Sequence, residues 1–268
     1  MTLLKQQAKS EWVSVLVWGL LIGGWLLFMV VLYGYLRDSE LMRSFQEMLA
    51  KMPPAMAVLY GSKSGFISVN GWLQSYAFGS WLSIPMVIFT GLFVADLVTR
   101  EIDRRTMEFV LSLPISRTRL LISRWVGLVL ALLLLHLIQL VAVLIGVRAI
   151  GESISLGRYL VAELNSVLLY LALGDVFLLI SLFINDYGPC LSTIMGLGLG
   201  LFFFHVATDS ATGALKAVRD ALPFAHLNAA QIITQGEVPV GDMALLAAIA
   251  AVALLISIYV FDRKQIAV

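Results

Sequence analysis

Six long apolar stretches, separated by shorter polar segments, constrain this 268-residue chain more than any other feature. A helix that crosses a bilayer needs about 20 predominantly apolar residues. The expected spans are residues 12–36, 72–98, 120–147, 159–184, 189–207 and 243–261. Only 13% of the residues are charged, whereas soluble domains carry about a quarter charged residues. The sequence therefore predicts an all-α integral membrane protein and excludes an ordinary soluble enzyme.

The chain is expected to form a single membrane domain over residues 1–268 of a multi-pass protein in the cell membrane. Pro85 lies inside the second span and predicts a kink there. The break at residues 185–189 predicts a tight hairpin between the fourth and fifth spans. Six spans place both termini on one side. The six arginines between the second and third spans favour the cytoplasm as that side.

Charge and cysteine content exclude several other classes of protein. The formal net charge is +1, which gives no basic field for nucleic acid. The single cysteine, Cys190, excludes an internal disulfide, a cysteine-based zinc site and an iron–sulfur cluster. No Gly-x-x-x-x-Gly-Lys-Ser/Thr sequence occurs, so the chain has no P-loop for ATP. We expect no catalytic residue, metal ligand or cofactor in this chain.

The connection between the second and third spans predicts a short amphipathic helix over residues 100–113. Glu101 and Arg105 are expected to pair on its polar face as an i, i+4 pair. Pro114 ends this helix, and Ser116 can cap the helix that enters the third span. Two interpretations stay open. The helix either anchors the connection at the membrane surface or docks onto a partner protein.

The same connection resembles the signature of ABC-2 type transporter permeases. Residues 101–117 share the family's acidic residues, its threonine and its Pro-x-Ser-Arg ending, with Arg105 where glycine is commonest. Residues 223–227 and 261–266 resemble the family's segment before the last span and its terminal motif. The resemblance covers the whole chain. It is closest to the small permeases grouped with multicopper-enzyme and nitrous-oxide reductase maturation transporters.

This resemblance implies a type V ABC exporter fold, with a coupling helix after the second span and an outward re-entrant-like segment before the sixth. It implies that two copies, expected to be identical, form the pathway of an unknown substrate. It also implies a separate ATPase dimer that binds ATP and magnesium. By resemblance, the positions expected to face the ATPase are Glu101, Arg105, Thr106, Glu108, Leu111, Pro114 and Arg117.

Polar side chains inside the spans are further candidates, because an ionisable residue there costs about 3 kcal/mol or more. Asp175 in the fourth span predicts either a helix–helix hydrogen bond or ion pair, or a position lining a water-filled cavity. His136, close to Gln139 in the third span, is either a packing residue or a proton carrier. Asp96 and Glu163 are expected near span ends, where they reach water.

Small and sulfur-containing residues suggest two other features. Gly196 and Gly200 in the fifth span allow another helix to approach closely, either from the same subunit or from a second copy. Between the first and second spans, apolar residues with helical spacing predict an amphipathic helix at the membrane surface. Its methionines could alternatively bind Cu(I) through their thioethers. These methionines are Met42, Met48, Met52 and Met56.

Two other functions compete with that of an ATP-driven permease. A secondary transporter driven by an ion gradient would use Asp175 and His136 to carry protons. Such transporters usually contain internal repeats and several buried ionisable residues. An intramembrane enzyme would need a clustered nucleophile and base or a metal centre, and the three histidines lie in separate segments. The sequence favours the permease, with an ATPase, a second copy and membrane lipids as partners.

Overall fold

The computed structural model describes residues 2–53, 68–104 and 116–264 of the chain, and the regular elements in these ranges are all helical. The elements are α1 (Thr2–Leu36), α2 (Glu40–Ala50), α4 (Val69–Ala77), α5 (Ser80–Leu97), α6 (Thr99–Asp103), α8 (Arg117–Ala149), α9 (Leu156–Ser181), α10 (Tyr187–Ala207), α11 (Gly213–Asp220), the 3-10 helix η2 (Pro223–His226), α12 (Ala229–Gln235) and α13 (Val240–Arg263).

Among the described residues, six helical segments are long and apolar enough to cross a membrane. They are Trp12–Leu36, Val69–Leu97, Arg117–Ala149, Leu156–Ser181, Tyr187–Ala207 and Val240–Arg263. Every end lies within three residues of the end expected from hydropathy. The prediction of six spans is therefore confirmed, and the chain is a multi-pass membrane protein.

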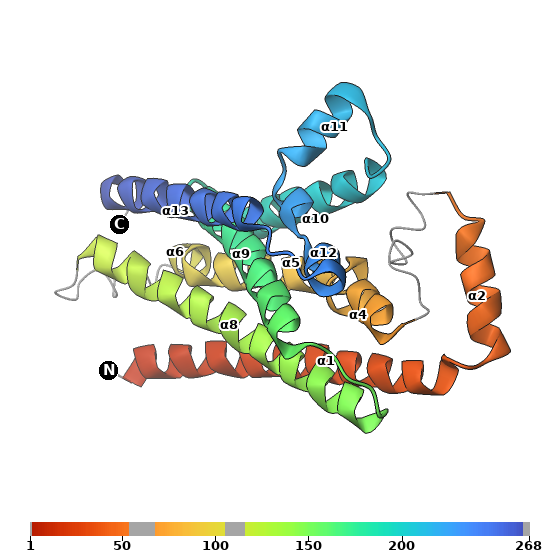
Figure 1. Cartoon of the computed structure of the whole chain (residues 1–268). Coiled ribbons are helices and arrows are strands. Elements are labelled where there is room, and N and C mark those ends of the chain that lie inside the picture. The colour runs from red at the N-terminus through yellow and green to blue at the C-terminus, as the bar shows by residue number, and fades with distance from the viewer. Residues whose placement is uncertain (1, 54–67, 105–115, 265–268) are drawn as a thin grey trace.

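The bundle has two distinct ends (Figure 1). Both chain termini and α6 lie at one end, which we call the terminal end. The helices α2, α4 and α12 lie toward the opposite end, which we call the distal end. The second-to-third connection therefore begins on the same side as the two termini.

The core is built around two helix pairs. The helix α1 packs along α8, and α13 packs along α9. A Cβ atom built on Gly19 of α1 would lie 2.5 Å from the side chain of Ile138 on α8. Glycine therefore allows these two spans to approach closely. The helix α9 lies at the centre and contacts α5, α8, α12 and α13.

Span two is interrupted at Phe78 and Gly79, whereas the sequence signal for a kink lies at Pro85. The helix α4 ends at Ala77, Phe78 is not helical, and α5 begins at Ser80. A Cβ atom on Gly79 would lie 2.4 Å from the Ser75 carbonyl oxygen, so this close backbone approach requires glycine. Pro85 lies inside the continuous helix α5.

Two predicted helix ends are confirmed. The hydroxyl of Ser116 accepts a hydrogen bond from the Arg119 amide at 3.2 Å and caps α8. The fourth and fifth spans form a tight hairpin, in which α9 ends at Ser181 and α10 begins at Tyr187. Pro189 lies in the first turn of α10, where its missing N–H removes no helical hydrogen bond.

The helix α2 follows α1 at the distal end and runs roughly perpendicular to it, as a surface helix would (Figure 1). The Met42 side chain is 3% exposed, whereas that of Met48 is 44% exposed. Met52 packs partly buried against the core, and Met56 lies outside the described residues. The thioethers of Met42 and Met48 therefore lie in different environments, and the structure gives the copper interpretation no support.

Candidate functional site

The most extensive polar network at the terminal end begins with an ion pair between Glu101 on α6 and Arg124 on α8. Glu101 is 4% exposed, and the Arg124 side chain is 12% exposed. Removing one member of a buried ion pair leaves the other charge uncompensated, which is strongly destabilising. Glu101 was expected to face a partner and to pair with Arg105. Its carboxylate is buried and connects α6 to α8, whereas Arg105 lies outside the described residues.

Thr99, the first residue of α6, connects the same segment to the α9–α10 hairpin. Its hydroxyl donates a hydrogen bond to the Ser181 carbonyl at 3.3 Å. The Cys190 sulfur lies 3.3 Å from the same hydroxyl. Thr99 and Cys190 are both fully buried. The start of α6 is therefore fixed where the fourth and fifth spans meet.

A third set of contacts joins the end of span two to the start of span five. The Arg100 guanidinium forms an ion pair with Asp96 at 2.9 Å and lies over the Tyr187 ring, 4.9 Å from its centroid. The Tyr187 hydroxyl donates to Asp96 at 2.8 Å and accepts from Arg100 at 3.2 Å. Asp96 thus lies near the polar end of its span, as expected.

The last described residue, Lys264, adds α13 to the network. Its carbonyl accepts a hydrogen bond from Arg117 at the start of α8. Its ammonium group donates to the Leu182 carbonyl at 2.6 Å. Partial burial lowers the pKa of the Lys264 ammonium. Arg117, which was expected to face an ATPase, therefore holds two spans together at this end.

Other charged side chains at the terminal end point to solvent. Asp103, Arg104 and Arg119 are exposed, as are Asp262 and Arg263. The remaining residues predicted to face an ATPase lie outside the described residues; they are Arg105, Thr106, Glu108, Leu111 and Pro114.

The roles of Thr99, Arg124 and Lys264 were missed from the sequence, because their contacts join residues 23 to 147 positions apart. One signal was available. An arginine inside a span, as Arg124 is, requires a buried partner.

The intramembrane candidates occupy separate positions. His136 donates through Nδ1 to the Leu132 carbonyl at 2.8 Å, and its ring lies 5.8 Å from that of Tyr170.

Asp175 is fully buried beside Trp125, and neither carboxyl oxygen accepts a hydrogen bond of normal geometry. No described ion pair includes Asp175, and the Trp125 side chain of α8 lies beside its carboxyl group, so the helix–helix hydrogen bond stays a prediction. The burial of Asp175 argues against the water-filled cavity. No described contact joins it to His136, which gives the ion-gradient hypothesis no support.

Gln139 and Glu163 are two further polar residues that the sequence predicts inside the spans. Gln139 donates through Nε2 to the Ala77 carbonyl at 3.0 Å, across the break in span two. Glu163 was expected to reach water near a span end, but it is 5% exposed. It is buried because α9 lies at the centre of the bundle.

The two spaced glycines of α10 do not pack inside the subunit. A Cβ atom on Gly196 or Gly200 would meet nothing within 4 Å. A Cβ atom on the neighbouring Gly198 would lie 2.7 Å from the side chains of Phe177 and Val87. Ser192 and Thr193 are also exposed. One face of α10 therefore presents small and polar residues outward from the subunit. We call Ser192, Thr193, Gly196 and Gly200 the open face of α10.

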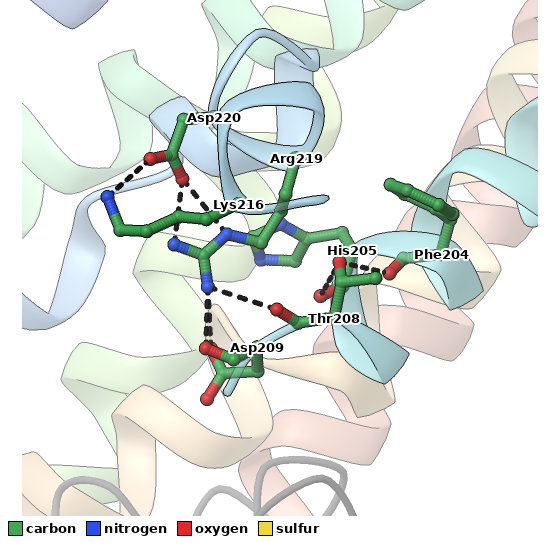
Figure 2. A network of polar contacts seen from close by, with 7 residues as sticks. All are labelled: Phe204, His205, Thr208, Asp209, Lys216, Arg219 and Asp220. Atoms are coloured by element: carbon green, nitrogen blue, oxygen red, sulfur yellow. Dashed lines mark hydrogen bonds and ion pairs between the residues drawn. The ribbon is translucent and has the colours of Figure 1, made fainter. Parts of the chain in front are cut away.

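At the distal end, Arg219 fastens α11 to the end of α10 (Figure 2). It donates to the carbonyls of Thr208 and Asp209 at 3.3 and 2.6 Å, which are backbone acceptors just beyond α10. Asp220 pairs with Lys216 and with Arg219, each at 2.7 Å. The hydrogen bonds from Lys216, and then those from Arg219, lower the pKa of the Asp220 carboxyl.

The segment before span six is anchored by contacts from two spans. Arg158 at the start of α9 donates to the carbonyls of Ile233 and Thr234 at the end of α12. Gln74 of α4 donates to the Ala230 carbonyl at 3.2 Å. These contacts place α12 between the second and fourth spans.

Polar groups also connect η2 and α13 to α9. The buried Asn165 accepts from the Asn228 amide at 2.9 Å and donates to the His226 carbonyl at 3.1 Å. The carboxylate of Asp242 lies 2.7 Å from His226 Nδ1 and accepts from the Asn228 side chain at 2.6 Å. His226 is therefore engaged with a carboxylate, and among the described residues no cluster of three or more His, Cys, Asp or Glu side chains could hold a metal ion.

Comparison with known proteins identifies one relationship. A family model described as "ABC-2 family transporter protein" matches residues 4–266, which include all six spans. A search of curated proteins finds no match.

Proposed function

The chain belongs to the ABC-2 transporter family as a transmembrane component, and from this premise we propose that it is the permease subunit of an ATP-driven exporter. Family members do not hydrolyse ATP themselves and carry no cofactor. ABC permeases generally pair with an ATPase subunit. The family match across nearly the whole chain is the observation that carries the proposal. Placement with the multicopper-enzyme maturation permeases rests on the sequence motifs alone.

The ATPase docks at the terminal end, which in this proposal faces the cytoplasm together with both chain termini. The coupling helix of residues 100–113 begins with α6. The exposed Asp103, Arg104 and Arg119 supply charge for contact with the partner. Arg105, Thr106, Glu108, Leu111 and Pro114 complete the docking surface. Glu101 and Arg117 act indirectly in this arrangement, as positioning residues.

The network at this end explains how movement of the docked segment would reach the pathway. Glu101 links α6 to the third span, and Thr99 links it to the hairpin of the fourth and fifth spans. Lys264 and Arg117 add the sixth span. A displacement of α6 therefore acts on several spans at once, because each link joins α6 or its neighbours directly to the end of a span.

The substrate pathway forms between two identical copies that meet at the open face of α10. Small residues allow close approach between helices. Ser192, Thr193, Gly196 and Gly200 lie on this face. In this proposal α12 is part of the outward re-entrant segment, supported by its contacts with α4 and α9.

Co-purification of the chain with an ATPase encoded beside its gene tests the proposal. Arg104→Glu combined with Glu108→Lys should reduce recovery of the ATPase by at least about 10-fold, because like charges placed across an interface repel. Arg148→Glu is the matched control, since Arg148 is an exposed arginine at the other end of α8. Full recovery with the double variant, or transport by the chain without any ATPase, contradicts the proposal.

A further inference from the structure

The helix α11 lies between spans five and six and has no part in the proposed coupling. None of its residues is buried. Among the described elements it packs mainly against η2, and Figure 1 shows it outside the bundle, near the distal end of α10. A helix that only faces water is polar on all sides, yet four of the eight residues of α11 are Ala, Leu or Val.

The apolar residues of α11 share one face of the helix. Leu215 and Val218 are three positions apart, so they lie next to each other on the helix surface, and they are 48% and 53% exposed. Ala214 borders them and is exposed as well. Lys216 and Asp220 pair on the other face at 2.7 Å. The helix is therefore amphipathic, and the described part of the chain leaves its apolar face uncovered.

Contacts at both ends fix the orientation of α11. Gly213 begins the helix with a φ of 63°, a left-handed conformation that favours glycine, so the chain turns sharply at this point. Near the other end, Arg219 donates to the carbonyls of Thr208 and Asp209, the first residues after α10 (Figure 2). The last turn of α11 is therefore held at the level where span five ends.

We propose that α11 is an interfacial helix that inserts Leu215 and Val218 into the lipid leaflet at the distal end, at the boundary between headgroups and acyl chains. Amphipathic helices bury their apolar face at this depth, and α11 is attached at the end of a span. Its charges also fit a lipid surface. Lys216 and Arg219 outnumber Asp220, and the phosphate groups of lipids are negatively charged.

A second copy of the chain fits this face less well than lipid does. A stable contact between two proteins buries about 800 Å² on each partner, whereas α11 offers two large apolar side chains on eight residues. The face assigned above to the second copy lies on α10 and consists of small and polar residues. Since Arg219 joins α11 to the end of α10, insertion of α11 holds the distal end of span five at a fixed depth in the membrane.

Fluorescence quenching tests this placement in the full-length chain, reconstituted into vesicles of phosphatidylcholine and phosphatidylglycerol. A dye is attached either to Leu215→Cys on the apolar face or to Lys216→Cys, the next residue, on the polar face. A lipid that carries a spin label near its headgroup should quench the dye at Leu215→Cys at least about twofold more than at Lys216→Cys. Iodide in the buffer should show the reverse order. The unsubstituted chain measures background labelling of Cys190, which is buried.

Each alternative gives a different result, and Val218→Cys on the same face should reproduce that of Leu215→Cys. Equal quenching by iodide at both positions would show that the apolar face lies in water, and overturns the proposal. Protection of Leu215→Cys from both quenchers would show that protein covers the face, and a disulfide between two copies would identify a second copy; either result overturns the proposal. So does stronger quenching by a label at the end of the acyl chain than by one near the headgroup. These measurements need only this chain, so their outcome is independent of an ATPase partner.

Discussion

Glu101 and Arg124 are 23 residues apart in the sequence and form a buried ion pair that joins α6 to span three. The ion pair therefore attaches α6, which directly follows span two, to α8, which forms span three. This ion pair distinguishes Glu101 from the exposed charged residues of the same end. The exposed charges at the terminal end point to solvent, whereas Glu101 holds α6 in place.

Glu101→Gln should lower the free energy of unfolding by about 3–5 kcal/mol, because the largely buried Arg124 guanidinium loses the carboxylate with which it pairs among the described residues. Thermal unfolding of the purified chain in detergent measures this loss. The exchanged pair, Glu101→Arg with Arg124→Glu, should recover part of it. Asp103→Asn on the exposed side of α6 is the control and should change stability little. Equal effects of Glu101→Gln and Asp103→Asn would show that the ion pair contributes nothing.

Gly198→Leu and Gly196→Leu should have opposite phenotypes although they are two residues apart. Gly198→Leu inserts a side chain against Phe177 and Val87 and should destabilise the subunit by about 1–3 kcal/mol. Gly196→Leu meets open space within the subunit and should leave its stability unchanged while weakening association of two copies.

Thermal unfolding and light scattering of the detergent-solubilised chain measure the two effects. Gly127→Leu, which also meets open space but lies on α8, is the control for association. If Gly196→Leu and Gly127→Leu leave the mass of the particle equally unchanged, the proposed open-face contact is wrong.

The attachment of α11 should weaken in acid. Hydrogen bonds from Lys216 and Arg219 lower the pKa of Asp220 in the folded chain. A carboxyl group with a lowered folded-state pKa stabilises the fold at pH above its unfolded-state pKa, and this contribution is lost as pH falls through the lowered pKa. Hydrogen exchange of α11 should therefore accelerate as the pH is lowered through that range, after correction for the intrinsic exchange rate. Asp220→Asn should remove this pH dependence, and a variant that keeps it would show that another group is responsible.

Arg158→Met should loosen the end of α12 without unfolding the bundle. The substitution removes the donor to the Ile233 and Thr234 carbonyls, and a helix end buried without such a partner is unfavourable. Hydrogen exchange of residues 229–236 should increase, while exchange in α9 stays slow. Arg148→Met, at an exposed arginine in the last turn of α8, serves as the control. The same exchange pattern in both variants would show that Arg158 does not hold α12.

The break in span two shows why local sequence rules were insufficient for some features. Pro85 carries the local signal for a kink, but the helix of span two is interrupted at a different position. The interruption occurs at Gly79, where the backbone passes so close to Ser75 that no side chain fits. Gln139, from a different span, satisfies the carbonyl left at the end of α4. The position of the break therefore depends on a neighbour that the local sequence does not specify.

The sequence by itself determined the number of spans and their limits, because the cost of placing polar backbone and charged side chains in lipid depends on local composition and length. It also determined the cap at Ser116, the hairpin before Tyr187 and the family. The tertiary structure alone decided which polar residues meet. Glu101 turned inward to Arg124, Glu163 became buried, and Gly196 remained open while Gly198 was packed. These outcomes depend on how the spans pack side by side, and a hydropathy pattern contains no information about which helices become neighbours.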